Sequence, residues 1–85
     1  MTLTVLFFAS LREALGTGRE LIEAPAPGLT AGQLREQLRA RGPQWAQALG
    51  PERAVRIAVN QVMAQADTPI PAGAEVAFFP PVTGG

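Results

Sequence analysis

The last two residues of the chain, Gly84 and Gly85, are the groups best placed to do chemistry. Glycine has no Cβ and reaches backbone conformations that are closed to other residues. Consecutive glycines before a free carboxylate therefore make a thin, flexible segment that can thread a narrow channel. The carboxylate of Gly85 is unhindered, so it can attack ATP and then be attacked by sulfur or by an amine. A Gly-Gly ending can also be chemically inert, and the residues alone leave that alternative open.

The side chains that usually catalyse reactions are largely missing from the 85 residues, which include no Cys, no His and no Lys. The lack of Cys and His excludes the usual zinc sites, disulfides and thiolate nucleophiles. The lack of Lys excludes Schiff-base chemistry. The single serine, Ser10, has no histidine to activate it. We therefore expect no metal site and no bound cofactor, and we place the reacting group at the chain end.

Size and composition predict one small cytoplasmic domain. A chain of 85 residues allows a single domain, and its 47% of hydrophobic residues is ample for a globular fold. No apolar run reaches the roughly 20 residues that span a bilayer, and the start lacks the basic residues of a signal peptide. A formal net charge of zero, without a basic cluster, argues against nucleic-acid binding.

Five segments rich in β-branched, aromatic or other apolar residues predict strands, at 2–9, 19–24, 56–59, 62–64 and 75–79. The first and the last segment are rich in phenylalanine. This composition suits two neighbouring strands at the centre of one sheet, which we expect to run parallel. The polar pair Asn60 and Gln61 predicts a turn between the third and the fourth strand.

A capping box predicts a short first helix. In this motif a Ser or Thr and a Glu or Gln three positions later each satisfy an exposed backbone N–H at the helix start. Ser10 and Glu13 have this spacing, and Gly16 can end the helix in a left-handed conformation. The expected apolar face comprises Leu11, Ala14 and Leu15.

A second capping box, formed by Thr30 and Gln33, predicts the main helix over 31–41. Leu34 and Leu38 are four positions apart and so lie on its buried face. The expected solvated face comprises Arg35, Glu36, Arg39 and Arg41.

The order of elements predicts an α+β domain over residues 1–81. It consists of a mixed sheet of four to five strands with one main helix packed across one face. Trp45, in a further short helical turn, is expected to cover the core. Pro80 and Pro81 end the last strand and stiffen the stem that follows. Residues 82–85 then form a flexible tail.

An exposed apolar patch is expected on the opposite face of the sheet. If the odd-numbered residues of the first strand face the helix, Leu6 and Phe8 face outward. By the same alternation Phe79 faces outward beside them, and Met63 joins from the short fourth strand. Such a patch usually marks an interface. A loop of the same chain could instead cover these side chains, and the sequence does not decide between the two.

Three segments resemble the small subunit of molybdopterin synthase, the MoaD family. They are LFFASLRE at 6–13, AVNQ at 58–61 and GAEVAFFPPVTGG at 73–85. The resemblance extends over nearly the whole chain, and the FFPPVTGG ending is quite specific. One departure is Ala74, where the family often has Asp after the turn glycine. Asp would help the turn, so the departure puts no functional residue in doubt.

The resemblance implies a ubiquitin-like β-grasp fold and the role of a sulfur carrier in molybdenum cofactor biosynthesis. In this family an E1-like partner, MoeB, uses ATP to adenylate the C-terminal glycine, here Gly85. The adenylate is then converted to a thiocarboxylate. The tail enters the active site of the large subunit, MoaE, where sulfur passes to a cyclic pyranopterin monophosphate. The large subunit supplies the catalytic side chains, and two small subunits bind a central dimer of large ones in a heterotetramer.

The resemblance also assigns roles to residues. Gly85 is the reacting residue and Gly84 gives the tail its flexibility. The residues implied in partner binding are Phe8, Met63, Phe79, Pro80, Pro81, Val82 and Thr83. The sulfur donor is not identified by the sequence. Other functions also remain open: a carrier for a thiamine-type pathway, a ubiquitin-like modifier joined to lysines of other proteins, and an interaction module with an inert tail.

Overall fold

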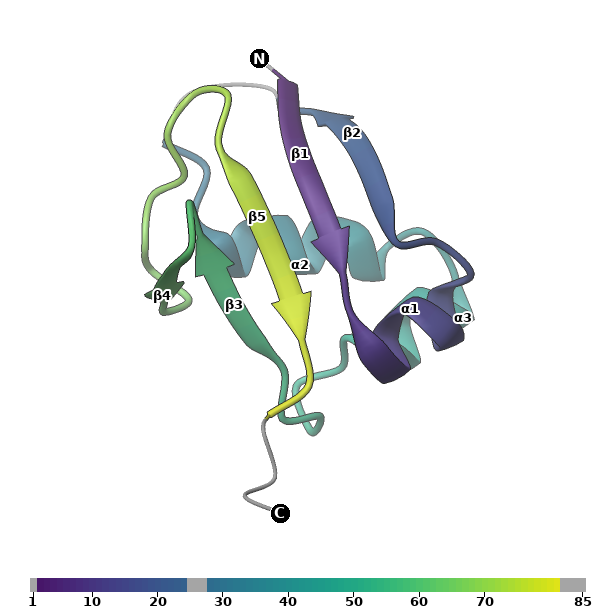
Figure 1. The fold of residues 1–85 in the computed structure, drawn as a ribbon. Coiled ribbons are helices and arrows are strands. Elements are labelled where there is room, and N and C mark those ends of the chain that lie inside the picture. Colours follow the sequence, from purple (N-terminus) through teal and green to yellow (C-terminus); the bar gives the residue numbers. More distant parts are fainter. Residues whose placement is uncertain (1, 25–27, 82–85) are drawn as a thin grey trace.

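A mixed five-stranded sheet forms the centre of the part of the chain that the computed structural model describes, residues 2–24 and 28–81 (Figure 1). The strand order is β2-β1-β5-β3-β4. The central strands β1 and β5 run parallel, and the other neighbours run antiparallel. The strands are β1 (Thr2–Phe7), β2 (Arg19–Glu23), β3 (Arg56–Val59), β4 (Val62–Ala64) and β5 (Glu75–Phe79). The five predicted strands and the parallel central pair are confirmed, but the first strand ends two residues and the second strand one residue before the predicted end.

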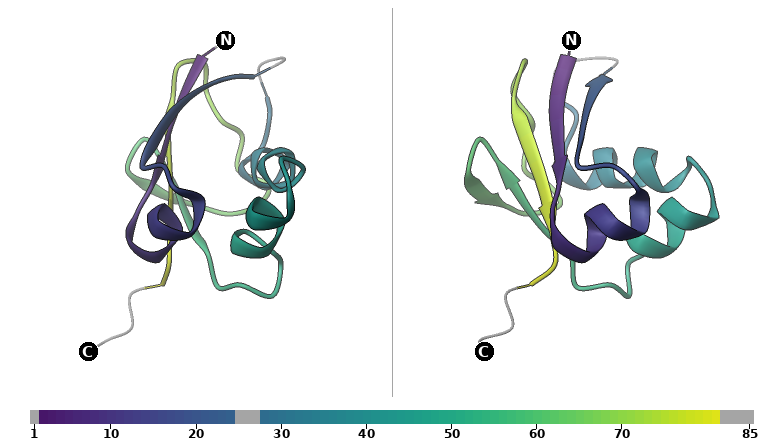
Figure 2. Two further views of the ribbon diagram at one scale, coloured as in Figure 1. Left: turned by 90° about the vertical axis from the view of Figure 1, so that its right-hand side faces the viewer. Right: turned by 45° about the vertical axis from the view of Figure 1, so that its right-hand side comes forward.

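Three helices in these ranges complete the fold: α1 (Ala9–Leu15), α2 (Ala31–Arg39) and α3 (Pro43–Ala48). The main helix α2 crosses one face of the sheet, and α3 lies on the same side of the sheet (Figure 2). Helix α1 follows β1 directly and packs against α3. None of the helices in the described part has the length and apolarity that crossing a membrane requires.

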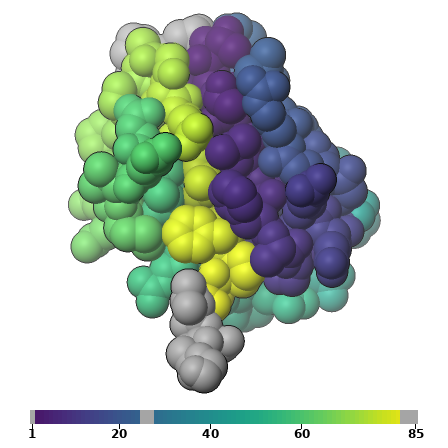
Figure 3. Space-filling view, viewed as in Figure 1, coloured from purple at the N-terminus to yellow at the C-terminus, as the bar shows by residue number. Residues whose placement is uncertain are grey.

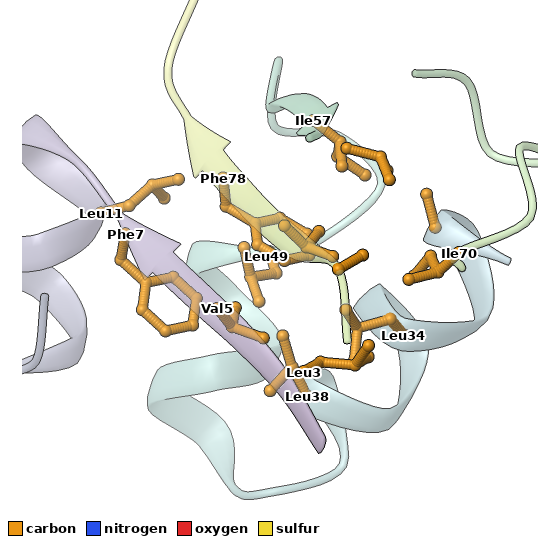
Figure 4. Close-up of a cluster of buried hydrophobic side chains, with 14 of the residues drawn as sticks. Leu3, Val5, Phe7, Leu11, Leu34, Leu38, Leu49, Ile57, Ile70 and Phe78 are labelled. Carbon is orange, nitrogen blue, oxygen red and sulfur yellow. The ribbon is translucent and has the colours of Figure 1, made fainter. Parts of the chain in front are cut away.

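The core lies between the sheet and α2. Leu3, Val5 and Phe7 of β1 are at most 1% exposed, and they belong to one core cluster with Leu34 and Leu38 of α2 (Figure 4). This alternation confirms the predicted inward face of β1, which follows from the two-residue period of a strand.

Aromatic rings cover one end of the core. Phe7 of β1 stacks on Phe78 of β5, with 5.8 Å between the ring centroids. Trp45 of α3 meets Phe7 edge to face, with 5.5 Å between the ring centroids. The guanidinium carbon of Arg41 lies over the Trp45 ring, 4.7 Å from its centroid. Trp45 is partly buried against the core cluster, so its predicted covering role is confirmed.

The capping box of α2 is present as predicted. Thr30 Oγ1 accepts from the backbone N–H of Gln33 at 3.1 Å, and Gln33 Oε1 accepts from the backbone N–H of Thr30 at 2.9 Å. The helix ends at Arg39, two residues before the predicted end.

The capping box predicted at Ser10 and Glu13 is wrong. Helix α1 begins at Ala9 with Phe8 as its N-cap, and no side chain caps it. The reason is the sheet: the N–H of Phe8 still donates to the carbonyl of Phe78, at 3.1 Å. The chain therefore turns into the helix immediately afterwards, with Ala9 at φ 53°. Ser10 thus lies inside the first turn, two positions after the N-cap, and is too late to cap the helix.

Two further features of α1 were predicted. Its end is confirmed, because Gly16 adopts φ 74° and its N–H donates to the carbonyl of Arg12 at 3.0 Å. Its apolar face is narrower than predicted. Leu11 and Leu15 are buried, but Ala14 is exposed, and its placement on the buried face is wrong.

Thr30, which caps a helix, and Ser10, which does not, give a matched pair of variants. We expect Thr30→Ala to lower the free energy of unfolding by about 1 kcal/mol, because it removes the hydroxyl oxygen that accepts from the backbone N–H of Gln33. We expect Ser10→Ala to change it by less than about 0.5 kcal/mol, because Ser10 caps nothing. Chemical denaturation of both variants measures the difference. Equal losses would show that the capping box at Thr30 contributes no more than an ordinary surface hydroxyl.

Candidate interaction face and chain end

The face of the sheet turned away from α2, which Figure 3 shows in front, carries a row of apolar side chains. The register places Leu6 of β1 beside Ala77 of β5, Ala77 beside Ala58 of β3, and Ala58 beside Met63 of β4. Ala58 and Ala77 are buried but do not belong to the core cluster. They form a flat floor between the larger side chains of Leu6 and Met63. We call this surface, together with Phe8 and Phe79, the outer apolar face.

Phe8 and Phe79 lie at the end of this face where β1 and β5 finish. Phe8 is 47% exposed, Met63 is 54% exposed, and Phe79 is half-buried. No loop of the described ranges covers Phe8 or Met63, so the alternative of a loop that hides the patch is excluded for these two. The predicted patch is confirmed, with Leu6 and Phe79 only partly exposed.

Two other exposed apolar residues were not predicted. Leu21 of β2 is 63% exposed and lies opposite Thr4 on the outer side of the sheet. Val62 of β4 is 69% exposed. The alternation of β1 could have indicated Leu21, since in the antiparallel register the partner of an outward residue also faces outward.

The stem of the chain end begins beside this face. Pro80 and Pro81 follow β5 directly and are half-buried. They form one wall of a groove of about 520 Å³ between α1, α3 and the segment before β3. Its other lining residues include Ser10, Leu11, Ala14, Gln47, Ala48 and Val55. The predicted site residues Val82, Thr83, Gly84 and Gly85 lie outside the described residues.

Arg35 holds the segment that forms one side of this groove. Its Nε donates to the carbonyl of Leu49 at 2.8 Å, and its Nη2 donates to the carbonyls of Gly50 at 2.7 Å and Arg53 at 3.2 Å. Burial lowers the pKa of the guanidinium, and the nearby charge of Arg39 adds to this effect. The prediction that Arg35 lies on a solvated face is therefore wrong. The three acceptor carbonyls lie more than ten residues later in the chain, so helical periodicity alone could not predict that Arg35 binds them.

Comparison with known proteins gives one family and several relatives. The model of the ThiS family matches residues 5–85. The molybdopterin synthase sulfur carrier subunit of Escherichia coli is 46% identical over 81 residues, 95% of this chain and 96% of that protein. The subunit of the same name from Haemophilus influenzae is 41% identical over 83 residues, 98% of this chain and 99% of that protein.

A solved structure supports the same grouping. A chain in the protein–protein complex of subunits 1 and 2 of the molybdopterin-converting factor from Helicobacter pylori is 26% identical to this chain. The two superpose with a TM-score of 0.69, and the match covers 100% of both chains. The ubiquitin-like β-grasp fold expected from the sequence is thereby confirmed.

The adjacent residues Phe7 and Phe8 test which face of β1 is buried. We expect Phe7→Ala to lower the free energy of unfolding by about 3–5 kcal/mol, because it opens a cavity under Trp45. We expect Phe8→Ala to change it by less than about 1 kcal/mol, because the side chain lies outside the core. Thermal and denaturant unfolding measure both. If Phe7→Ala does not fold, Phe7→Leu replaces it. A larger loss for Phe8 than for Phe7 would reverse the assignment of the faces.

Proposed function

Because the chain belongs to the ThiS family, we propose that it is the sulfur-carrying small subunit of a molybdopterin synthase. The observation that carries this proposal is the high identity, over nearly the full chain, to two curated subunits of that name. Both names favour the molybdopterin pathway over the thiamine-type alternative. We also propose a cytoplasmic location, where the ATP that the chemistry requires is available.

In the proposed reaction the carboxylate of Gly85 attacks the α-phosphate of ATP held by an E1-like, MoeB-like partner. Pyrophosphate leaves and an acyl-adenylate forms. Hydrosulfide released by a donor then attacks the acyl carbon, displaces AMP and loses its proton, which leaves a thiocarboxylate on Gly85. That sulfur is transferred to the pyranopterin precursor within the large subunit. The absence of side chains at Gly84 and Gly85 suits passage through a narrow channel.

The outer apolar face is the proposed docking surface for a MoaE-like large subunit. A relative of this chain was solved in complex with a second subunit, which supports a partner of this kind. Phe8, Met63 and Phe79 surround the flat floor of this face. Each large side chain buried by the partner is worth about 1.5–3 kcal/mol. Pro80 and Pro81 give the chain end a stiff start beside this surface, and Val82 and Thr83 continue it toward the two glycines.

The thiocarboxylate can be detected directly. We expect the intact mass of the purified chain to rise by the difference between sulfur and oxygen after incubation with the activating enzyme, ATP and a sulfur source. Deletion of Gly85 should abolish this change and leave the thermal unfolding midpoint unaltered, because Gly85 comes six residues after the end of the last strand and terminal residues contribute little to stability. An unchanged mass of the full chain would contradict the sulfur-carrier function. Conjugates to lysines of other proteins would support the ubiquitin-like modifier instead.

Docking can be tested apart from sulfur transfer. We expect Phe8→Ala to weaken binding to the large subunit at least tenfold, because a side chain worth about 1.5–3 kcal/mol on burial is lost. Val62→Ala is the matched control, since Val62 is also an exposed apolar residue of the sheet but faces away from the outer apolar face. Isothermal titration calorimetry gives both affinities. Equal losses for the two variants would show that docking does not use this face selectively.

A further inference from the structure

Two arginines lie at opposite sides of the outer apolar face. Arg19 of β2 is directly opposite Leu6 of β1. Arg56 of β3 is directly opposite Phe79 of β5. Because directly opposed residues of antiparallel strands project to the same side of a sheet, both arginine side chains belong to the outer side. Both residues are exposed, and we call them the flanking arginines.

The strand order sets the distance between the flanking arginines. Their strands, β2 and β3, lie on either side of the central pair and are three strand spacings apart, which is about 14 Å. Along the strands, Arg56 lies two residues beyond the row of Leu6 and Ala77 that Arg19 extends, which adds about 7 Å. The two backbone positions are therefore about 16 Å apart, with the apolar floor between them.

The guanidinium groups of the flanking arginines have no acceptor in the part of the chain that the structure describes. On the opposite side of the sheet, by contrast, Arg39 binds Glu36 at 2.8 Å. No described carboxylate or carbonyl binds the side chain of Arg19 or Arg56 in this way. Their donors are therefore available to a partner.

The charges of the outer face differ between its two ends. Glu23, which is bonded to the hydroxyl of Thr2, and Glu75, which lies beside Thr4, are toward the start of β1. The flanking arginines are toward the other end, from which the stem of the chain end leaves. The face thus has an acidic end and a basic end, although the formal net charge of the whole chain is zero.

An arginine at the margin of an apolar face restricts what can cover that face. A charge that loses its water on docking is costly unless it is paired, so a purely apolar partner surface is disfavoured at both positions. A carboxylate matches the planar donor group of arginine and accepts two N–H bonds at once. The apolar floor between the two charges favours a protein, because nucleic acids bind along continuous basic surfaces.

We propose that the flanking arginines bind two acidic side chains of the large subunit, one on each side of an apolar patch. This inference rests on the proposed function and identifies the chemistry of the docking surface. The two carboxylates are separated by roughly the distance between Arg19 and Arg56, on the order of 16 Å. In a reversed orientation they would meet the acidic end of the face. A single orientation is therefore favoured, in which the stem leaves beside the acidic part of the partner surface.

Removal of one charge at a time tests the role of the flanking arginines. Arg19→Gln and Arg56→Gln should each weaken binding of the purified large subunit about fivefold at roughly 50 mM salt, because each removes one ion pair. The double variant should lose about 25-fold, because sites more than about 10 Å apart act additively. At roughly 1 M salt the losses should shrink, since the screening length falls to about 3 Å. Isothermal titration calorimetry measures all of these affinities.

Gln37→Glu is the matched control for net charge. It changes the charge of the chain by the same amount as either neutralisation, and Gln37 is exposed on α2, on the opposite side of the sheet (Figure 2). We expect it to change the affinity less than about twofold, because it lies away from the outer apolar face. The thermal unfolding midpoints of all these variants should match that of the unaltered chain, because every substituted position is exposed.

The absence of lysine from the chain allows the partner carboxylates to be located. Arg19→Lys and Arg56→Lys keep the positive charge, and each introduces the only side-chain amine of the chain. A carbodiimide joins an amine to a carboxylate in direct contact through an amide bond. Mass spectrometry of the digested complexes should show positions 19 and 56 each joined to an Asp or a Glu of the large subunit. Gln37→Lys, which places the amine on the helix side, should give no such cross-link.

Two results would overturn this inference while the proposed function stands. One is that Arg19→Gln and Arg56→Gln bind the large subunit as tightly as Gln37→Glu does. The other is that neither position 19 nor position 56 is cross-linked in complexes that still form. If the unaltered chain does not bind the large subunit at all, the proposed docking and this inference both fail. The binding of the unaltered chain therefore distinguishes the two failures.

Discussion

The parallel pairing of β1 with β5 is the interaction on which the rest of the structure depends. It brings the first and the last strand of the chain together at the centre of the sheet. Their inward phenylalanines, Phe7 and Phe78, stack and form the base on which Trp45 packs. Because parallel strands finish at the same edge, the exposed Phe8 and the stem at Pro80 leave the sheet side by side. One pairing thus builds the core and also aligns the docking face with the chain end.

Most of the fold could be predicted from local patterns. Two-residue alternation located the strands, and the spacing of Thr30 and Gln33 located the start of α2. The failures have long-range causes. The predicted capping box at Ser10 does not form, because Phe8 is bonded in the sheet to Phe78, seventy positions later in the chain, and the helix begins immediately after it. Arg35 was assigned to solvent because its carbonyl partners are distant in sequence and carry no side-chain signal.

The candidate site, like the fold, could be predicted only in part from local patterns. The alternation of β1 sufficed to predict that Phe8 faces outward, and the neighbouring strands supplied Phe79 and Met63. Leu21 was missed because its exposure follows from pairing with Thr4, which β2 alone does not reveal. The reacting group assigned to Gly85 belongs to the main chain and not to a side chain. In the proposed function the folded domain therefore serves mainly to hold the stem of the chain end beside a surface that a partner can recognise.

The contacts of Arg35 have a consequence for how this protein can change over evolutionary time. All three of its acceptors are main-chain carbonyls. Every amino acid supplies a carbonyl, so substitutions at exposed positions such as Glu52 or Ala54 leave these bonds intact. The backbone path of residues 49–53 therefore does not depend on the side chains that this segment carries. Descendants of this protein can diversify the rim of the groove beside Pro80 and Pro81 and acquire new partner preferences, while a single inherited arginine preserves the shape.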